Sequence, residues 1–429
     1  MASFIGKVSS QVDRKFGNES RNGARKKARS LEGALVKSKR LLLHYPLLNV
    51  GGAEKSTLRM MESLANRGWR ITLVLTTGGG KLEGEVDPRV EIVRLRPRGS
   101  GSRFVAAPAI LGKLASLGDL AGYGFMRLVA IWRMIPFLFR KYDAAAVLIH
   151  SAPSTFVRRI VRANTKVHWI RNDLERIDPE SRLTRRLARA DPAIDWYVCV
   201  SEGARQSLIN RLPNVASKAI TVYNILNTAQ MRQSAESDDP FPGRVDNELR
   251  ILTVGRLLDR DKALFRLARI CRRLADAGLK FRWFLIGSGP DEARLRALID
   301  ELGIGNYLRL LGPKGNPFPF YSHADLVAVL SYHEGLCGVI NEAKVVGCAV
   351  LATDFAGVRE QLANGKNGWI VANDEELITA FLAQLLREPR RIKQTQNHSY
   401  PELILDDDHK VDRLEELFMR DSITRATRR

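Results

Sequence analysis

Residues 323–371 read HADLVAVLSYHEGLCGVINEAKVVGCAVLATDFAGVREQLANGKNGWIV. Two continuous apolar runs in this segment, LVAVLS and AVLAT, are typical of short strands that are buried on both faces. Between the runs, Glu334 and Glu342 flank the sequence GLCGVIN, and Glu342 falls where a helix is expected to begin. The segment therefore predicts two buried strands joined by a turn and a helix, with a pair of carboxylates in the connection.

The residues before this segment continue the alternation of strands and helices. Further strand-like runs are ILTVGRL at 251–257, FRWFLIG at 281–287 and YLRLLG at 307–312. The stretch GSGPDEARLRALIDELG, residues 287–303, predicts a helix with Pro290 at its first position and Gly303 at its end. This order predicts an α/β domain over residues 249–390.

The first half of the chain begins with a similar unit. Arg40 to His44 reads as a short buried strand, a turn at 49–54 contains two adjacent glycines, and helical spacing continues to Gly68. Further strand-like runs follow at 71–77, 144–150, 165–170 and 196–200. The fold class that we expect is α/β, with two Rossmann-like β-α-β domains that face each other across a ligand-binding cleft.

The expected domain boundaries follow changes in composition. They are a basic flexible arm at 1–40, an N-terminal domain at 41–232, a linker at 233–248, a C-terminal domain at 249–390 and a helical tail at 391–429. The tail either stands alone or returns to the N-terminal domain. Two domains agree with a length of 429 residues, since roughly 150 residues per domain is usual.

Charge is distributed unevenly along the chain. The formal net charge is +21, to which residues 1–40 contribute +8, residues 41–232 contribute +14 and residues 233–429 contribute −1. The asymmetry indicates that the first half meets an anionic surface, either acidic lipid or nucleic acid, or else carries a basic face that is merely solvated. Because the sequence contains no recognition helix or aromatic RNA-binding motif, we expect no nucleic-acid partner.

Residues 104–142 combine large apolar side chains with Arg and Lys, as in FMRLVAIWRMIPFLFRKY. This pattern is typical of a surface that enters a lipid interface and holds anionic headgroups, but also of amphipathic helices that pack on a sheet. We expect neither a secretory signal nor a spanning helix, and the four cysteines form no C-x-x-C pair. The expected location is therefore cytoplasmic, with peripheral binding to the inner face of the cytoplasmic membrane.

Two cations near the start of the second domain suit a diphosphate. Arg256 follows a predicted strand, and Lys262 comes six residues later, where helix N-termini also converge. Cations at this place would stabilise the charge that grows on a diphosphate leaving group, so no protein nucleophile is required. The carboxylates of Glu334 and Glu342 would accept hydrogen bonds from vicinal sugar hydroxyls.

The turn at Gly51 and Gly52 is open to two interpretations. Glycines allow a ligand to approach the backbone, and the N-terminus of the following helix attracts anions. The turn matches neither G-x-G-x-x-G nor the P-loop pattern, so a tight turn without a ligand is equally consistent with it.

These motifs together resemble glycosyltransferase family 4, whose members are retaining, nucleotide-sugar-dependent enzymes of the two-domain GT-B fold. In the second half the resemblance is carried by VGRLLDRDKAL, LIGSGPDEARL, LLGPKGN and the segment 323–371. In the first half it is carried by HYPLLNVGGAEKS, YDAAAVLIHS, VCVSEGAR and VYNILNTAQM. The resemblance covers residues 41 to 385 in order, and the ordered set is more specific than any single motif.

The resemblance implies a role for each candidate residue. It assigns catalysis to Arg256 and Lys262, which hold the donor diphosphate, to Glu334, which holds the transferred sugar, and to His150, which lies beside that sugar. It assigns donor binding to Gly51, Gly52, Gly287, Gly289, Gly335, Leu336, Cys337, Gly338, Val339 and Glu342, the last of which holds the ribose hydroxyls. We expect no metal and no separate cofactor, because the UDP- or GDP-linked sugar is itself the donor substrate.

The expected function is that of a retaining glycosyltransferase in the synthesis of cell-surface polysaccharide or glycolipid. Its expected partners are the nucleotide-sugar donor, a glycan or lipid-linked acceptor and an anionic membrane surface. Alternatives are an inverting transferase or an epimerase of the same fold, and a basic nucleic-acid-binding protein.

The sequence also departs from the family at two positions. Ala263 stands where a glycine often follows the lysine, and Arg171 stands where the family often has histidine. Arg171 either meets a more anionic acceptor or is a neutral change. Cys337 lies beside Glu334, but the sequence places no base next to it, so a packing role is favoured for its thiol.

Overall fold

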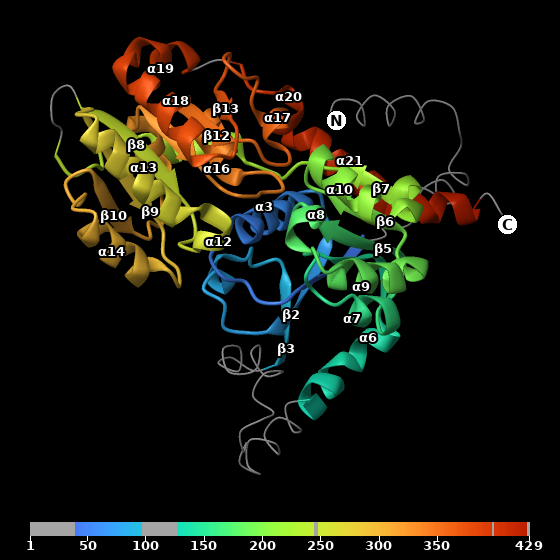
Figure 1. The fold of residues 1–429 in the computed structure, drawn as a ribbon. Helices are drawn as coiled ribbons and strands as arrows, with labels where there is room; N and C mark the ends of the chain where they lie inside the picture. The colour runs from blue at the N-terminus through green and yellow to red at the C-terminus, as the bar shows by residue number, and fades with distance from the viewer. Residues whose placement is uncertain (1–38, 97–126, 244–247, 397–398, 427–429) are drawn as a thin grey trace, which may run out of the picture. The chain divides into compact units, whose positions relative to one another are not determined.

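A computed structural model of the protein describes residues 39–96, 127–243, 248–396 and 399–426, and for residues 420–426 it describes the backbone alone. Residues 40–429 form one compact unit, within which the described residues other than Lys39 lie. The basic arm expected at 1–40 lies almost entirely outside the described residues, as does the first part of the stretch 104–142. Both sheets belong to this unit, to which the following description applies (Figure 1).

The first half of this unit contains a seven-stranded parallel sheet. Its strands are β1 (Arg40–Tyr45), β2 (Arg70–Thr77), β3 (Glu91–Arg96), β4 (Lys141–Val147), β5 (Arg162–Ile170), β6 (Trp196–Cys199) and β7 (Ala219–Thr221). They lie in the order β3-β2-β1-β4-β5-β6-β7, with β1 pairing with both β2 and β4. The side chains of Leu41, Leu42 and Leu43 are all fully buried, as expected for a central strand that is covered on both faces.

The second half contains a six-stranded parallel sheet. Its strands are β8 (Leu249–Val254), β9 (Phe281–Ile286), β10 (Leu308–Gly312), β11 (Leu326–Val329), β12 (Ala349–Thr353) and β13 (Trp369–Val371). They lie in the order β10-β9-β8-β11-β12-β13. The expected α/β class with two parallel-sheet halves is therefore confirmed, and the strands quoted from the segment 323–371 are β11 and β12.

Helices connect the successive strands. In the first half they are α3 (Gly52–Asn66), a helix at 127–134, α6 (Pro136–Phe139), α7 (Thr155–Arg159), α8 (Leu174–Ile177), α9 (Arg182–Ala190), α10 (Glu202–Arg211) and α11 (Thr228–Ala235). In the second half they are α12 (Asp259–Lys262), α13 (Leu264–Asp276), α14 (Glu292–Glu301), α15 (Phe318–His323), α16 (Gly338–Val345), α17 (Val358–Gln361), α18 (Glu375–Arg387), α19 (Pro389–Thr395), α20 (Glu402–Leu405) and α21 (Asp407–Ala426). Short 3-10 helices lie at Glu83–Glu85, Asp191–Ala193 and Pro213–Lys218. Among the described helices, none has the length and apolar character needed to cross a bilayer.

Three helix starts differ from the expectation. α16 begins at Gly338, so Glu342 lies inside the helix and not at its start. α14 begins at Glu292, with Asp291 as its N-cap residue, so Pro290 precedes the helix instead of opening it. α3 begins at Gly52, so only Gly51 of the two glycines stands outside the helix. The starts of α14 and α3 are displaced by one or two residues from the expected positions. Displacements of this size are common at helix ends.

The C-terminal helix α21 packs on the first half of the unit. Its residues Val411, Leu414, Leu417 and Phe418 belong to the same buried cluster as β1, β2 and β5. At the surface, Arg67 at the end of α3 pairs with Asp408, Asp412 and Glu415 of α21. Figure 1 shows this helix in red beside β5. The chain thus crosses from the second sheet back to the first.

Candidate functional site

The predicted site residues come from the carboxyl ends of strands at the point where the strand order reverses. In the first sheet, Gly51 follows β1 and His150 follows β4, its neighbour on the other side. In the second sheet, Arg256 follows β8 and Glu334 follows β11, which are also neighbours. Open parallel sheets bind ligands at such switch points, because the loops there diverge and leave a crevice.

Lys262 and Glu334 form an ion pair although 72 residues separate them in the sequence. The Ser331 hydroxyl donates a 3.0 Å hydrogen bond to the same carboxylate oxygen, Oε1. Burial opposes the charge of the Lys262 ammonium, but the Glu334 carboxylate more than offsets burial and raises the pKa of Lys262 above its usual value. Lys262 is therefore a fixed cation that already lies against the carboxylate expected to hold the sugar.

Ala263, which follows this lysine, lies in the left-handed backbone region with φ 53° and ψ 45°. Its side chain is fully buried. Glycine adopts this conformation at little cost, whereas an alanine is strained there. The structure thus explains why the resembling family often has glycine at this position, and it shows that the lysine can be placed without one.

Arg256 differs from Lys262 in its surroundings. Its side chain is exposed, and within the described part of the chain it forms no ion pair. It lines, with Lys262, a small cavity of about 10 Å³ at the ends of β8 and β11. Its positive charge also favours the ionised form of the Glu54 carboxyl in the first half. Arg256 is therefore the cation that is available to an incoming anion.

Gly287 and Gly289 are explained by backbone packing. A Cβ at Gly287 would collide with the carbonyl oxygen of Gly255, and a Cβ at Gly289 with that of Leu257. Gly287 also has a φ of +151°, a region that side chains rarely adopt. These two glycines bring the turn after β9 against the turn that carries Arg256, and so they position that arginine through the backbone.

Glu342 on α16 is held by residues from both halves. The Tyr321 hydroxyl donates a 2.9 Å hydrogen bond to Oε2 of Glu342, and Arg59 of α3 lies 4.0 Å from Oε1. The sequence analysis missed Arg59 and Tyr321, because only the fold brings α3 and α15 beside α16. Glu342 retains acceptor capacity at Oε1, since a carboxylate oxygen accepts more than one hydrogen bond.

The loop between the two carboxylates is mostly packed. Leu336 is buried in the core cluster of the first half, and Val339 packs against the core of the second. The Cys337 thiol is buried, burial raises its pKa to about 12, and its backbone N–H donates to Gln361. Gly338 opens α16 and has open space where a Cβ would stand. The thiol is therefore inert, and any ligand contact of this loop is made through its backbone.

Beside Gly51 lies a carboxyl group that the sequence analysis missed. A Cβ at Gly51 would collide with the Glu54 side chain, so this carboxyl folds back over the turn. Burial raises the pKa of Glu54. The motif that could have identified it is a glutamate at the third helical position, which commonly reaches back to the start of its helix. A partly buried carboxyl makes the Gly51 turn a poor diphosphate cradle and favours an acceptor contact there.

His150 is neutral at physiological pH. Burial, helped by the charges of Arg171 and Arg186, lowers its pKa to about 4. Its Nδ1 accepts a 3.3 Å hydrogen bond from the backbone N–H of Arg171, so the remaining proton of the neutral ring sits on Nε2. His150 therefore presents a hydrogen-bond donor.

Arg171, the departure from the family pattern, is half-buried, and its guanidinium is bonded within the protein. Its guanidinium donates to the carbonyl of Leu148 at 2.7 Å, to Asn224 Oδ1 at 3.1 Å and to Thr57 Oγ1 at 3.1 Å. These bonds tie the end of β4 to α3 and to the segment after β7. Arg171 thus links these three elements beside the site through its guanidinium.

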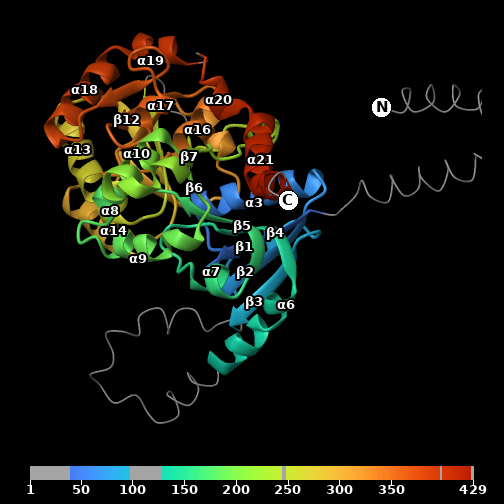
Figure 2. The ribbon, with the colours of Figure 1, turned by 90° about the vertical axis from the view of Figure 1, so that its right-hand side faces the viewer.

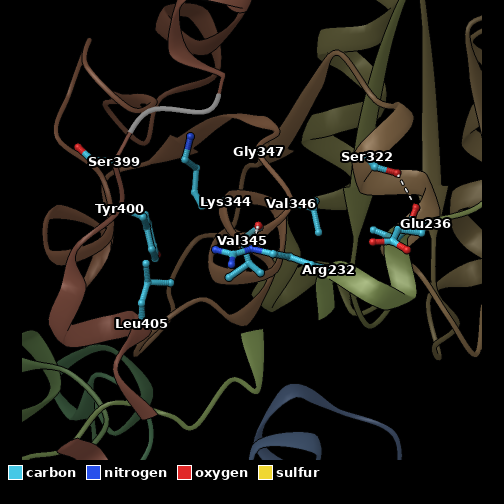
Figure 3. Close-up of a pocket in the computed structure, with 11 residues that line it drawn as sticks. Arg232, Glu236, Ser322, Lys344, Val345, Val346, Gly347, Ser399, Tyr400 and Leu405 are labelled. Carbon is cyan, nitrogen blue, oxygen red and sulfur yellow. Dashed lines mark hydrogen bonds between the residues drawn. The ribbon is translucent and has the colours of Figure 1, made fainter. Parts of the chain in front are cut away.

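A hollow of about 550 Å³ lies elsewhere in the second half (Figure 3). Arg232, Lys344 and Tyr400 are among its lining residues, which include none of the predicted site residues. The Lys344 ammonium donates to the carbonyls of Thr395 and Cys348 and so is satisfied within the protein. We assign no ligand to this hollow.

Two protein-family models match the chain. Residues 51–211 match the glycosyl transferase 4-like domain, and residues 234–400 match glycosyl transferases group 1. Together the two matches include every predicted site residue.

Curated relatives and solved structures agree with these matches. The chain is 32% identical over 148 residues to a putative colanic acid biosynthesis glycosyltransferase, WcaL of Salmonella typhimurium, covering 32% of this chain and 36% of WcaL. It is 29% identical over 186 residues to an N-acetylgalactosamine-N,N'-diacetylbacillosaminyl-diphospho-undecaprenol 4-alpha-N-acetylgalactosaminyltransferase of Campylobacter jejuni, covering 43% of this chain and 48% of the relative. These matches thus span at most about half the length of either relative.

Among solved structures, HepE of Anabaena in complex with UDP and glucose matches the fold with a TM-score of 0.63. The match covers 88% of this chain and 98% of HepE at 18% identity. At this identity the similarity establishes the shared two-sheet architecture, which is the GT-B fold.

Proposed function

Because the chain belongs to the glycosyltransferases of the GT-B fold, with a 4-like domain followed by a group 1 domain, we propose that it transfers a sugar from a nucleotide-diphosphate donor to a glycan or lipid-linked acceptor. The observation that carries the proposal is the grouping of Arg256, Lys262 and Glu334 at the switch point of the second sheet. Arg256 is available to bind an anion, and Lys262 forms an ion pair with Glu334 beside it. These groups suit a donor whose phosphates are anionic and whose sugar carries many hydroxyls.

The donor occupies the second half in this proposal. Arg256 binds the diphosphate, and Lys262, already paired with Glu334, lies between the leaving phosphate and the sugar. The backbone N–H groups at the start of α16 add positive potential there. Charge on the departing diphosphate grows in the transition state, so cations placed at it lower the barrier.

The acceptor approaches from the first half. His150 carries its proton on Nε2 and donates a hydrogen bond to the transferred sugar, while Glu54 lies at the Gly51 turn as an acceptor of a substrate hydroxyl. In this scheme the leaving phosphate, and not a protein group, takes the proton of the incoming hydroxyl, which attacks the face from which the phosphate departs, so the sugar keeps its anomeric configuration. An NMR assignment of the anomer formed tests retention, and an inverted product would overturn it.

Peripheral membrane binding belongs to the same proposal. The side chains of Leu128, Ile131, Trp132 and Phe139 are 58–78% exposed on the helical segment 127–139, which Figure 2 shows beside β3. Arg133 and Arg140 anchor this segment to β3 through the Arg94 carbonyl and the Glu91 carboxylate. Aromatic and aliphatic side chains among cations suit the headgroup region of an anionic bilayer. Flotation with anionic vesicles tests this part, and recovery in the vesicle-free fraction at low salt would refute it.

The donor proposal is tested by Glu342→Gln with three probes, UDP, GDP and inorganic pyrophosphate. Loss of the carboxylate weakens hydrogen bonds to the ribose, so we expect the Kd of the preferred nucleotide to rise about tenfold. Pyrophosphate has no ribose, and its Kd stays unchanged. Glu376→Gln, an exposed carboxylate on α18, is the matched control. Absence of nucleotide binding by the unmodified protein would overturn the proposal.

A further inference from the structure

The first turn of α10 contacts the loop that carries Glu334. Ser201 is the N-cap residue of α10, and its hydroxyl accepts a 3.0 Å hydrogen bond from the Ala204 N–H. The same hydroxyl donates to the carbonyl of Gly335 at 2.7 Å. Gly335 directly follows Glu334, so one side chain of the first half is bonded to the backbone beside the sugar-binding carboxylate.

Glu360 of α17 caps the same helix from the other half. Its two carboxylate oxygens accept the backbone N–H groups of Glu202 at 2.7 Å and Gly203 at 2.9 Å. The Tyr223 hydroxyl donates a third bond, at 2.9 Å. The first N–H groups of a helix have no partner within the helix, and the positive end of its dipole favours a carboxylate. Two of the orphan N–H groups of α10 are thus satisfied only when the two halves are in contact.

Three glycines allow the backbones to meet at this place. A Cβ at Gly203 would stand 2.8 Å from the Gly357 nitrogen, and a Cβ at Gly335 would stand 2.5 Å from the Arg171 carbonyl oxygen. Gly357 lies in the left-handed region with φ +78°, and a Cβ there would collide with the Gly335 carbonyl. Side chains are therefore excluded from both sides of the contact.

We propose that Glu360 and Gly203 are positioning residues for sugar transfer, because together they set the closed spacing of the two halves and hold the Gly335 loop in place. The inference rests on the proposed function for its catalytic consequence. Glu360 touches no substrate in this scheme. It acts through α10 and Ser201, which fix the backbone at Gly335 and so fix Glu334 opposite His150.

Gly203→Ala separates positioning from folding. Alanine favours a helix more than glycine, so the variant unfolds at the same temperature as the parent protein or higher. Its methyl group, however, collides with Gly357 only in the closed arrangement. We expect a longer and broader distance distribution between spin labels at Arg185→Cys and Lys366→Cys, which are exposed positions in the two halves. The four native cysteines are buried and escape labelling.

The Kd for UDP and kcat should respond differently to Gly203→Ala. UDP is held by the second half, so its Kd changes by less than about twofold, whereas kcat falls about tenfold because the reacting groups are misplaced. Gly84→Ala, at an exposed glycine with open space around its Cβ position, is the control and changes neither readout. An unchanged label distance in Gly203→Ala would overturn the proposal.

Glu360 is tested by a graded series. Glu360→Ala removes all three hydrogen bonds, Glu360→Gln keeps one acceptor oxygen, and Tyr223→Phe removes only the phenol bond. Opening of the label distance should follow that order, with Glu376→Ala as the control without effect. If the protein neither binds UDP nor turns over a donor, the proposed function fails, while the label distances still decide whether Glu360 and Gly203 set the spacing. A flat series would overturn the role of Glu360.

Discussion

The donor-site cluster of the second half, Arg256, Lys262 and Glu334, contrasts with the exposed segment 127–139 of the first half. In the cluster, Lys262 is neutralised by the Glu334 carboxylate, whereas Arg256 is exposed on the turn after β8. In the segment, large apolar side chains are exposed, and the neighbouring Arg133 and Arg140 bond to β3. The second half has almost no net charge, yet it holds the cations that the proposed chemistry requires.

The contrast shows that net charge and charge placement report different properties. A charge of +14 over residues 41–232 attracts an anionic surface over many contacts, each of which contributes little. Arg256, by contrast, is a single cation at a strand end that is positioned by backbone packing. In the proposed mechanism it acts on one bond of one substrate. Variants in the two regions should therefore fail in different assays.

The largest effect is expected for Arg256→Ala. Removing a cation that stabilises a growing negative charge lowers kcat about 100-fold or more. Turnover of a sugar nucleotide identified by the nucleotide-binding screen measures it, with far-ultraviolet circular dichroism to confirm folding. Arg260→Ala is the matched control, because Arg260 is an exposed neighbour whose ion pair, among the described residues, is with Asp261. Near-normal turnover in Arg256→Ala would show that the position of this one cation does not matter for turnover. The contrast between Arg256 and the net charge of residues 41–232 would then fail.

The first sheet contains buried histidines, which make the stability of the protein sensitive to acid. His44 and His168 in the first sheet are buried, and burial lowers their pKa to about 4 and about 3. A histidine whose folded pKa is depressed contributes full stability above about pH 6.5, and this stability is lost as the pH falls toward the folded pKa. We expect the free energy of unfolding to fall by about 2 kcal/mol per histidine between pH 7 and pH 5.

Urea unfolding at both pH values measures this loss. His168→Phe, which preserves the ring contact with Tyr197, should reduce the loss by about a third, since His150 also has a lowered pKa and one of three such histidines is removed. A variant with the same pH dependence as the parent protein would contradict the assignment of acid sensitivity to these buried rings.

The exposed segment is tested by Trp132→Ser combined with Phe139→Ser. Each aromatic ring that enters a lipid interface contributes about 1.5–3 kcal/mol, so partition into anionic vesicles should fall at least about tenfold. Turnover of a water-soluble acceptor should stay unchanged, because the segment precedes the amino end of β4, whereas the candidate site lies at the carboxyl ends of the strands. Leu377→Ser, at an exposed leucine of the second half, is the control. If Leu377→Ser lost as much vesicle binding as the double variant, vesicle binding would depend on exposed apolar side chains in general and not on the segment 127–139.

The smallest effect is expected for Ala263→Gly. Relief of the left-handed strain is opposed by the greater entropy of glycine in the unfolded chain, and the net gain in stability is about 0.5–1 kcal/mol. Thermal unfolding measures it. Destabilisation would instead show that the packing of the Ala263 methyl group outweighs the strain.

Much of the fold could be predicted from short-range patterns. Apolar runs predicted β1, β2, β4, β5, β6, β8, β9, β10, β11 and β12, because strands covered on both faces need apolar side chains at every position. The edge strands β3, β7 and β13 escaped prediction. β3 mixes charged and apolar residues, as in Glu91 to Arg96, because an edge strand is only partly covered.

The sequence by itself determined which residues stand at strand ends, and so it placed Arg256, Glu334 and His150 correctly with respect to the sheets. Only the tertiary structure decided how those ends are combined. It paired Lys262 with Glu334, brought Arg59 to Glu342, folded Glu54 over Gly51 and set Glu360 against α10. The reason is physical: hydrophobic periodicity depends on neighbours along the chain, whereas ion pairs and caps depend on groups that meet only after the two sheets have formed.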